Sequence, residues 1–120
     1  MDFNHLRNYL LSKKGTTEEL PFGPDALVFK VMGKIFAIVA YQDNPLRISL
    51  KCDPEHAEAL RAMYRAVTPG YHLNKNHWNT VILDNSIPES ELFQMIDDSY
   101  QLIVKRLKKA DQAKLGALDE

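Results

Sequence analysis

Hydrophobic residues near the amino terminus recur at helical spacing. Phe3, Leu6 and Leu10 lie three or four positions apart, and the residues between them are mostly polar. Asp2 stands directly before this pattern, where a helix N-cap is expected. The pattern predicts an amphipathic helix over residues 2–13.

Two apolar segments that follow in the chain predict a β-hairpin. Residues 27–32 and 35–41 are rich in β-branched and aromatic side chains. Gly33 and Lys34 between them suit a two-residue turn of type II′, in which glycine comes first. A weaker alternation over residues 18–22 indicates a short edge strand before the hairpin.

Two further strands complete the predicted sheet. Apolar and polar residues alternate strictly over residues 46–51, so the apolar side chains face the core and the others face water. The outward-facing residues are Arg47, Ser49 and Lys51. Residues 78–83 have the composition of a strand that closes the sheet.

Helices are predicted on both sides of this last strand. One begins at Asp53, which is followed by a first-turn proline, and apolar residues at helical spacing continue to Val67. A proline and a glycine then break this helix. Residues 86–89 match a capping box, and one apolar stripe continues from there to Leu107.

The order of the elements is helix, four strands, helix, strand and helix. Grouped strands with short connections predict an α+β fold, with an antiparallel sheet of about five strands and helices packed on one face. The other face of the sheet is left for a different role. The length of 120 residues fits a single domain over residues 1–107, followed by a charged C-terminal tail at 108–120.

Charge and cysteine content exclude several classes of protein. Fifteen Lys and Arg against sixteen Asp and Glu give a formal charge of −1, so any nucleic-acid role must be local. The sequence has no segment suited to a transmembrane helix and no pattern of a secretory signal, so we expect a cytoplasmic protein without a membrane partner. A single cysteine excludes an intramolecular disulfide.

Residues 59–83 combine basic and aromatic side chains and contain no acidic residue. This combination is typical of surfaces that hold phosphates and stack bases. The candidate nucleic-acid contacts in this stretch are Arg61, Arg65, Tyr71, His72, Asn74, Lys75 and His77. The alternative is that Tyr71 and Trp78 pack in the core while the arginines are solvated.

A second basic set lies on the predicted strands and their turn. Its members are Lys30, Lys34, Arg47 and Lys51. If these strands are neighbours, the four residues form one cationic patch around Ser49. Solubility and the protection of sheet edges explain such residues equally well.

Reactive side chains form no recognisable catalytic or metal-binding pattern. His72 and His77 are five positions apart, so a metal ion would need further ligands such as His56 or Asp84. Cys52 precedes a helix start, where the helix dipole would lower the pKa of its thiol; alternatively it is a small buried apolar residue. We predict no metal site, no cofactor and no enzymatic activity.

Three segments of the chain resemble a known protein family. They are residues 49–55, 68–81 and 87–100. The most specific part is the run from Leu73 to Trp78. On these segments the chain resembles the MmcQ/YjbR family over about residues 2–107. The resemblance implies a CyaY-like (frataxin-like) fold and a bacterial protein that contacts DNA.

Two details limit what the resemblance implies. Asn85 stands where the family usually has glycine, and asparagine still tolerates positive φ. Frataxins hold iron on an acidic ridge formed largely by the first helix, but residues 2–13 contain a single acid, Asp2. Iron binding is therefore not carried over to this chain.

These observations predict a monomeric DNA-binding protein. It contacts phosphates through the basic residues of the sheet and of the 71–78 loop. The alternative is a protein-interaction or small-ligand-binding module, in which the aromatic and amide side chains of that loop form a pocket or docking surface. DNA and another protein are thus the two expected partners.

Overall fold

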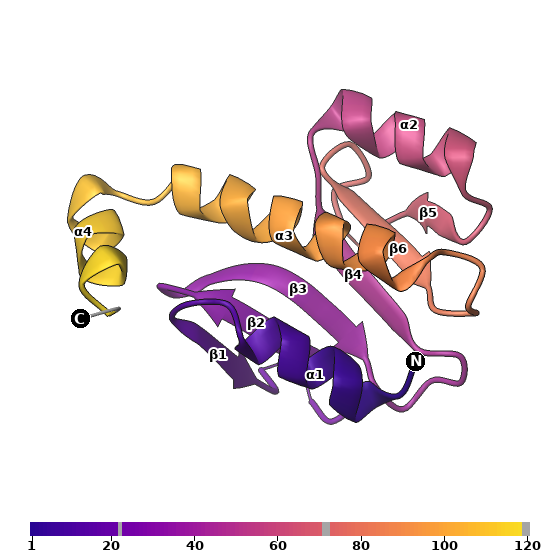
Figure 1. Ribbon diagram of the computed structural model, residues 1–120, viewed down its shortest axis with the longest axis horizontal. Helices are drawn as coiled ribbons and strands as arrows, with labels where there is room; N and C mark the ends of the chain where they lie inside the picture. The colour runs from indigo at the N-terminus through magenta and orange to yellow at the C-terminus, as the bar shows by residue number, and fades with distance from the viewer. Residues whose placement is uncertain (22, 71–72, 119–120) are drawn as a thin grey trace.

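The computed structural model describes residues 1–21, 23–70 and 73–118, which form six strands and four helices. All six strands belong to one antiparallel sheet, in the order β1-β2-β3-β4-β6-β5. Helices α1 and α3 lie across one face of this sheet (Figure 1). The elements are α1 (Phe3–Leu11), β1 (Thr16–Glu19), β2 (Leu27–Val31), β3 (Lys34–Ala40), β4 (Arg47–Lys51), α2 (Pro54–Met63), β5 (Val67–Pro69), β6 (Trp78–Ile82), α3 (Glu89–Lys105) and α4 (Lys109–Ala117).

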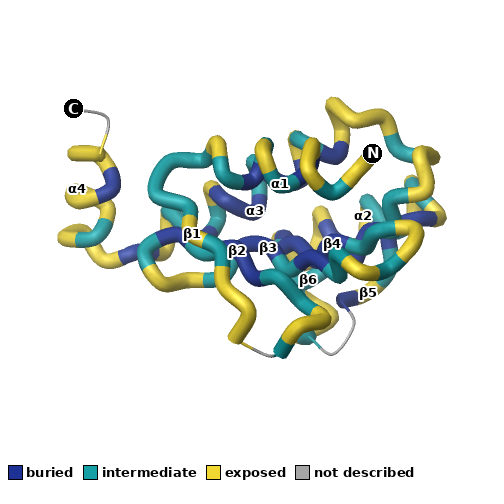
Figure 2. The backbone as a smooth tube through the Cα atoms, turned by 90° about the horizontal axis from the view of Figure 1, so that it is seen from below, coloured by how far each residue is buried: buried dark blue, intermediate teal, exposed yellow. Residues whose placement is uncertain are grey.

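The hydrophobic core lies between the sheet and helices α1 and α3 (Figure 2). Leu10 of α1 and Ile96 of α3 are fully buried in one cluster with Phe29 and Phe36 of the sheet. The ring of Tyr100 meets that of Phe36 edge-on, with 5.4 Å between the ring centroids. The predicted α+β fold with helices packed on one face of an antiparallel sheet is confirmed.

One predicted helix cap is confirmed and another is wrong. The Asp2 carboxylate accepts a hydrogen bond from the backbone N–H of His5 at 2.8 Å, which caps α1 as predicted. Ser86 does not cap α3, because its hydroxyl donates to Asp84 Oδ1 at 2.5 Å. Helix α3 instead begins at Glu89 without a side-chain cap, and proline precedes it.

The β2–β3 hairpin forms, but its turn differs from the prediction. Val31 pairs with Lys34, so the two turn residues are Met32 and Gly33 rather than Gly33 and Lys34. Their φ angles of 49° and 79° are both positive, as a type I′ turn requires, and here glycine occupies the second position. The edge strand β1 also begins before the predicted residues 18–22.

Helix α2 ends earlier than its apolar spacing predicts. It stops at Met63 because Tyr64 adopts an extended conformation, with φ −126° and ψ 122°. The chain then forms β5, a sixth strand that the sequence did not predict. Val67 is buried in the core as part of this strand and not as part of a helix.

The charged carboxy-terminal segment contains a helix. Helix α4 places Leu115 in the hydrophobic core with 5% exposure. Gly15 lies next to this leucine, since a Cβ at position 15 would approach the Leu115 Cδ1 atom to 2.6 Å. Among the described residues, no helix has the length and apolar character needed to cross a membrane.

Candidate functional site

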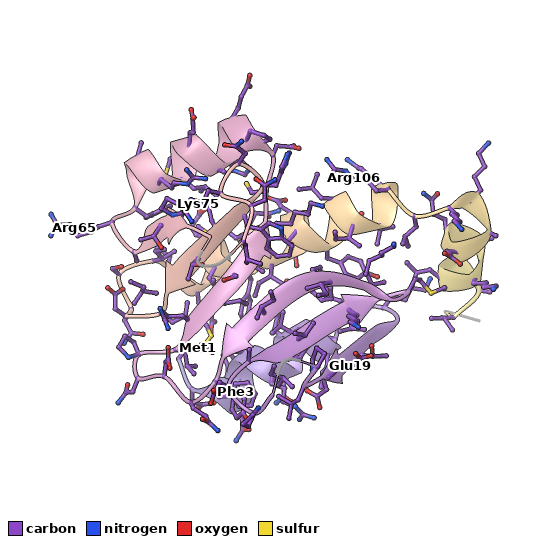
Figure 3. The ribbon with its side chains drawn as sticks, turned by 180° about the vertical axis from the view of Figure 1, so that it is seen from behind. Met1, Phe3, Glu19, Arg65, Lys75 and Arg106 are labelled. Atoms are coloured by element: carbon purple, nitrogen blue, oxygen red, sulfur yellow. The ribbon has the colours of Figure 1, made fainter. Side chains whose placement is uncertain are left out.

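The face of the sheet opposite α1 and α3 carries most of the nucleic-acid contacts that were predicted on the strands. Figure 3 shows the molecule from behind, with the strands in front of these helices. Cross-strand pairs on β4 and β6 set the layout of this face, which we call the open face. The pairs are Arg47 with Ile82, Ser49 with Thr80 and Lys51 with Trp78. The Ser49 and Thr80 hydroxyls are 2.8 Å apart and buried, so a hydrogen bond joins β4 to β6 at the centre of the open face.

Trp78 lies at one end of the open face and outside the hydrophobic core. Asn79 and Val81 on the same strand are buried, and the Asn79 amide donates to the Ala57 carbonyl of α2. Strand alternation therefore directs Trp78 to the opposite face, where it is partly exposed. The predicted alternative, in which Trp78 packs in the core, does not hold.

Gly70 leaves the space beside the tryptophan. Its backbone N–H donates to the Trp78 carbonyl at 2.8 Å. A Cβ at position 70 would lie 2.7 Å from the Trp78 Cβ, which is closer than side chains pack. A glycine is therefore needed for β5 to approach the start of β6 this closely.

Lys51 is a partly buried cation with a second cation near it. Burial lowers the pKa of its ammonium group, and the positive charge of Arg106 lowers it further. Among the described residues no carboxylate pairs with Lys51. The contribution of Arg106 was left open by the sequence, because it depends on where the carboxyl end of α3 lies relative to β4.

Two other strand cations are already paired with acids. Lys30 Nζ lies 2.8 Å from Glu19 on the neighbouring strand β1. Arg47 Nε donates to Asp43 Oδ2 at 2.8 Å. Arg47 also lies at the end of β4 opposite to Lys51, so the four strand cations do not converge on one patch around Ser49.

Arg61 has a structural role in the loop before β6. Its Nε donates to Asn79 Oδ1 at 2.7 Å, and its guanidinium also donates to the Lys75 carbonyl. Asn74 folds the same loop by accepting from the backbone N–H of Asn76 at 3.0 Å. Through these contacts the helix holds the loop that carries the exposed Lys75 side chain.

The register places Lys34 and Lys51 at one end of the sheet; Lys75 lies in the loop that leads into β6 at this end, and the charge of Arg106 at the end of α3 acts on Lys51. The β2–β3 turn, the last residue of β4 and the first residue of β6 share this end, because these strands are antiparallel. We call it the cationic end; its residues are Lys34, Lys51, Lys75 and Arg106. Within the described part of the chain, none of the four forms an ion pair.

The remaining predicted contacts do not belong to the cationic end or lie outside the described residues. Arg65 follows α2 and points away from the body of the molecule, far from Arg106 in Figure 3. His77 is partly buried, and its carbonyl accepts from the Cys52 N–H at 2.8 Å. Tyr71 and His72 lie outside the described residues.

Cys52 behaves as a buried apolar residue. It is 7% exposed, and burial together with the nearby carboxylates of Asp53 and Asp98 raises the pKa of its thiol to about 11. The lowered pKa considered from the sequence is therefore wrong. In residues 1–21, 23–70 and 73–118, no three His, Cys, Asp or Glu side chains group closely enough to hold a metal ion.

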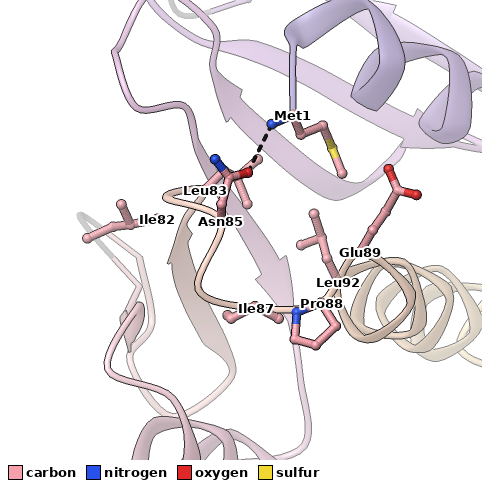
Figure 4. Close-up of a pocket in the computed structure, with 8 residues that line it drawn as sticks. All are labelled: Met1, Ile82, Leu83, Asn85, Ile87, Pro88, Glu89 and Leu92. Carbon is pink, nitrogen blue, oxygen red and sulfur yellow. Dashed lines mark hydrogen bonds between the residues drawn. The ribbon is translucent and has the colours of Figure 1, made fainter.

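A cavity of about 280 Å³ lies near the amino end of α3, away from the cationic end (Figure 4). Its wall is mostly apolar, with Asn85 and Glu89 as polar members. Asn85 has a φ of 68°, and this positive value fits a position at which the resembled family usually has glycine. The residues lining the cavity are Met1, Ile82, Leu83, Asn85, Ile87, Pro88, Glu89 and Leu92.

These features define a small α+β protein whose six-stranded antiparallel sheet is covered by helices on one face and open on the other. A sequence model of the YjbR family matches residues 11–102. The chain belongs to the YjbR family.

Relatives agree with this assignment in sequence and in structure. YjbR of Escherichia coli K12 is 39% identical over 107 residues, which cover 89% of this chain and 91% of the relative. YbdF of Escherichia coli O157:H7 is 40% identical over 95 residues, covering 79% and 78%. The crystal structure of Deinococcus radiodurans protein DR2400 superposes with a TM-score of 0.90 at 39% identity, covering 96% of this chain and 88% of that one.

Proposed function

We propose that this protein binds DNA through phosphate contacts at the cationic end. The observation that carries the proposal is the position of these four cations at or beside one end of the sheet, where none has an acidic partner among the described residues. Lys51 supports it most directly, because a partly buried ammonium beside a second cation is relieved of repulsion when a phosphate binds between them. Binding, and not catalysis, is the activity that we assign.

The number of free cations sets the expected strength and character of binding. Strong binders neutralise about 6–10 phosphates, whereas this end offers four cations. The net charge of −1 adds no long-range attraction. We therefore expect modest affinity, a salt dependence shallower than that of strong binders, and little sequence preference, since phosphate contacts carry no sequence information.

Fluorescence anisotropy with short labelled DNA across a salt series tests this function. Each lost phosphate contact should make the slope of log K against log salt shallower by about 0.9 for duplex or about 0.7 for single strands. Lys51→Ala and Lys75→Ala should each show this change. Arg65→Ala removes an exposed cation that follows α2 and lies far from Arg106 in Figure 3; it is the matched control and should keep the slope.

Two outcomes would contradict the proposal. One is the absence of saturable binding at low salt, where electrostatic attraction is strongest. The other is an equal effect of Arg65→Ala and of the two variants at the cationic end, because it would show that DNA is attracted to the surface without a specific site.

A second function, the binding of a small ligand, is favoured by the cavity near α3. Its volume is close to the lower limit of about 300 Å³ for ligand pockets, and its wall is apolar with two polar groups. A ligand that occupies it should raise the Tm by mass action. An Ile87→Trp variant, which adds bulk at a partly buried residue of the cavity wall, should abolish that rise.

A further inference from the structure

We propose that the open face binds single-stranded nucleic acid, with one base stacked on the Trp78 indole and the adjacent phosphate held by Lys51. This inference rests on the proposed DNA-binding function and adds the form of nucleic acid and the manner of contact. It depends on the position of one aromatic ring and its cross-strand neighbour.

Trp78 is a large aromatic side chain that the fold does not use in its core. The indole is partly exposed, and its N–H has no hydrogen-bond acceptor within the described residues. The Gly70 N–H donates to the Trp78 carbonyl at 2.8 Å, and Trp78 pairs with Lys51 in the β4–β6 ladder, so the backbone that carries the ring is fixed on both sides. An aromatic ring at a surface on such a backbone offers a stacking platform that every base can use.

Lys51 stands directly opposite Trp78 on the neighbouring strand. Side chains in such a pair have Cβ atoms about 4.5–5.5 Å apart and point to the same face. A cation and an aromatic ring at this spacing match a nucleotide, whose phosphate and base are joined through one sugar. Because Lys51 has no acidic partner among the described residues, its charge is available for that phosphate.

The open face favours a single strand over a duplex. In a duplex the flat faces of the bases are covered by their neighbours in the stack, so an indole cannot reach them without unstacking. The middle of the open face is neutral and internally bonded through Ser49 and Thr80, and Arg47 at its far end is paired with Asp43. With few free cations, base stacking has to supply much of the affinity.

The chain contains one tryptophan, so its fluorescence reports on this position alone. The experiment titrates the full chain at low salt with a short oligothymidylate and with a duplex of equal length. Tryptophan emission and the anisotropy of labelled DNA are followed together. We expect the single strand to quench the emission over the concentration range in which anisotropy rises, and to bind more tightly than the duplex.

Variants separate stacking from charge. Trp78→Leu should weaken single-strand binding about 5- to 150-fold, the loss for one stacked base. Trp78→Phe keeps an aromatic ring and should retain most of the affinity. Its binding would show that the loss in Trp78→Leu comes from the missing ring and not from a folding defect. Lys51→Gln should reduce the salt slope by about 0.7 while the quenching remains.

Each outcome separates this inference from the proposed function. Binding of duplex at least as tight as of the single strand, with unchanged tryptophan emission, would overturn the stacking contact and leave phosphate binding intact. If Trp78→Leu and the wild-type chain bind the single strand with equal affinity, the stacking contact is likewise overturned and phosphate binding is left intact. If neither form of DNA binds at low salt, both proposals fall.

Discussion

Ser99 in α3 joins strands β3 and β4 at the point where their ladder ends. Its hydroxyl donates to the Phe36 carbonyl at 2.6 Å and accepts from the Lys51 backbone N–H at 2.9 Å. Ala37 and Leu50 are the last pair in register, so the hydroxyl bridges the next two residues. Ser99 is fully buried, which leaves no water to replace it when it is removed.

The cost of Ser99→Ala follows from these two bonds. A buried polar group left without a partner costs about 1–3 kcal/mol. The bond to Phe36 is buried and the bond from Lys51 is only partly buried, so we expect a total loss of about 2–4 kcal/mol in the free energy of unfolding. At about 4 °C per kcal/mol for a domain of this size, the Tm should fall by about 8–16 °C.

Urea unfolding followed by circular dichroism measures this loss. The midpoint should fall with an unchanged m-value, because the surface exposed on unfolding stays the same. Ser90→Ala removes an exposed hydroxyl from the same helix and should change stability by no more than about 0.5 kcal/mol. A Ser99→Ala loss below about 1 kcal/mol would refute the bridging role, because it would mean that the two backbone groups find other partners.

Three further predictions follow from particular contacts. Gly70→Ala should lower the Tm and shift the tryptophan emission, because the new methyl group meets the Trp78 Cβ; an unchanged spectrum would contradict the close approach. Arg7 lowers the pKa of Glu18, so this pair stabilises the fold above pH about 4.5 and the stability is lost as the pH falls further; Glu18→Gln should weaken that acid dependence in urea titrations. Cys52 should react with a thiol reagent at pH 8 only after unfolding, and fast labelling of the folded chain would disprove its burial.

The sequence predicted those elements whose signals are local. The strand over residues 46–51 and the Asp2 cap depend on neighbours in the chain, and both elements form. The alternation is confirmed only in part, because Ser49, which was expected to face water, is buried against Thr80 of the neighbouring strand. The end of α2 was wrong because Val67 has the same spacing whether it continues a helix or begins a strand. Ser86 was wrong because an equally local partner, Asp84, competes for its hydroxyl.

The candidate site was harder to predict because it depends on strand order. The pairing of Lys30 with Glu19 is visible only when β1 lies beside β2. Arg47 carries its own signal, since Asp43 lies four residues before it and an intervening turn brings the two together. Arg106 could not be assigned at all, because its distance from Lys51 is set by the direction in which α3 crosses the sheet.

An open sheet has two unpaired borders, and both are short here. At one border β1 has four residues, of which the last two are acidic. At the other border β5 has three residues and ends in Pro69, which has no N–H to offer a further strand. Short borders that end in acids or in proline disfavour the addition of another strand, so the sheet can leave one face uncovered while its edges resist edge-to-edge aggregation.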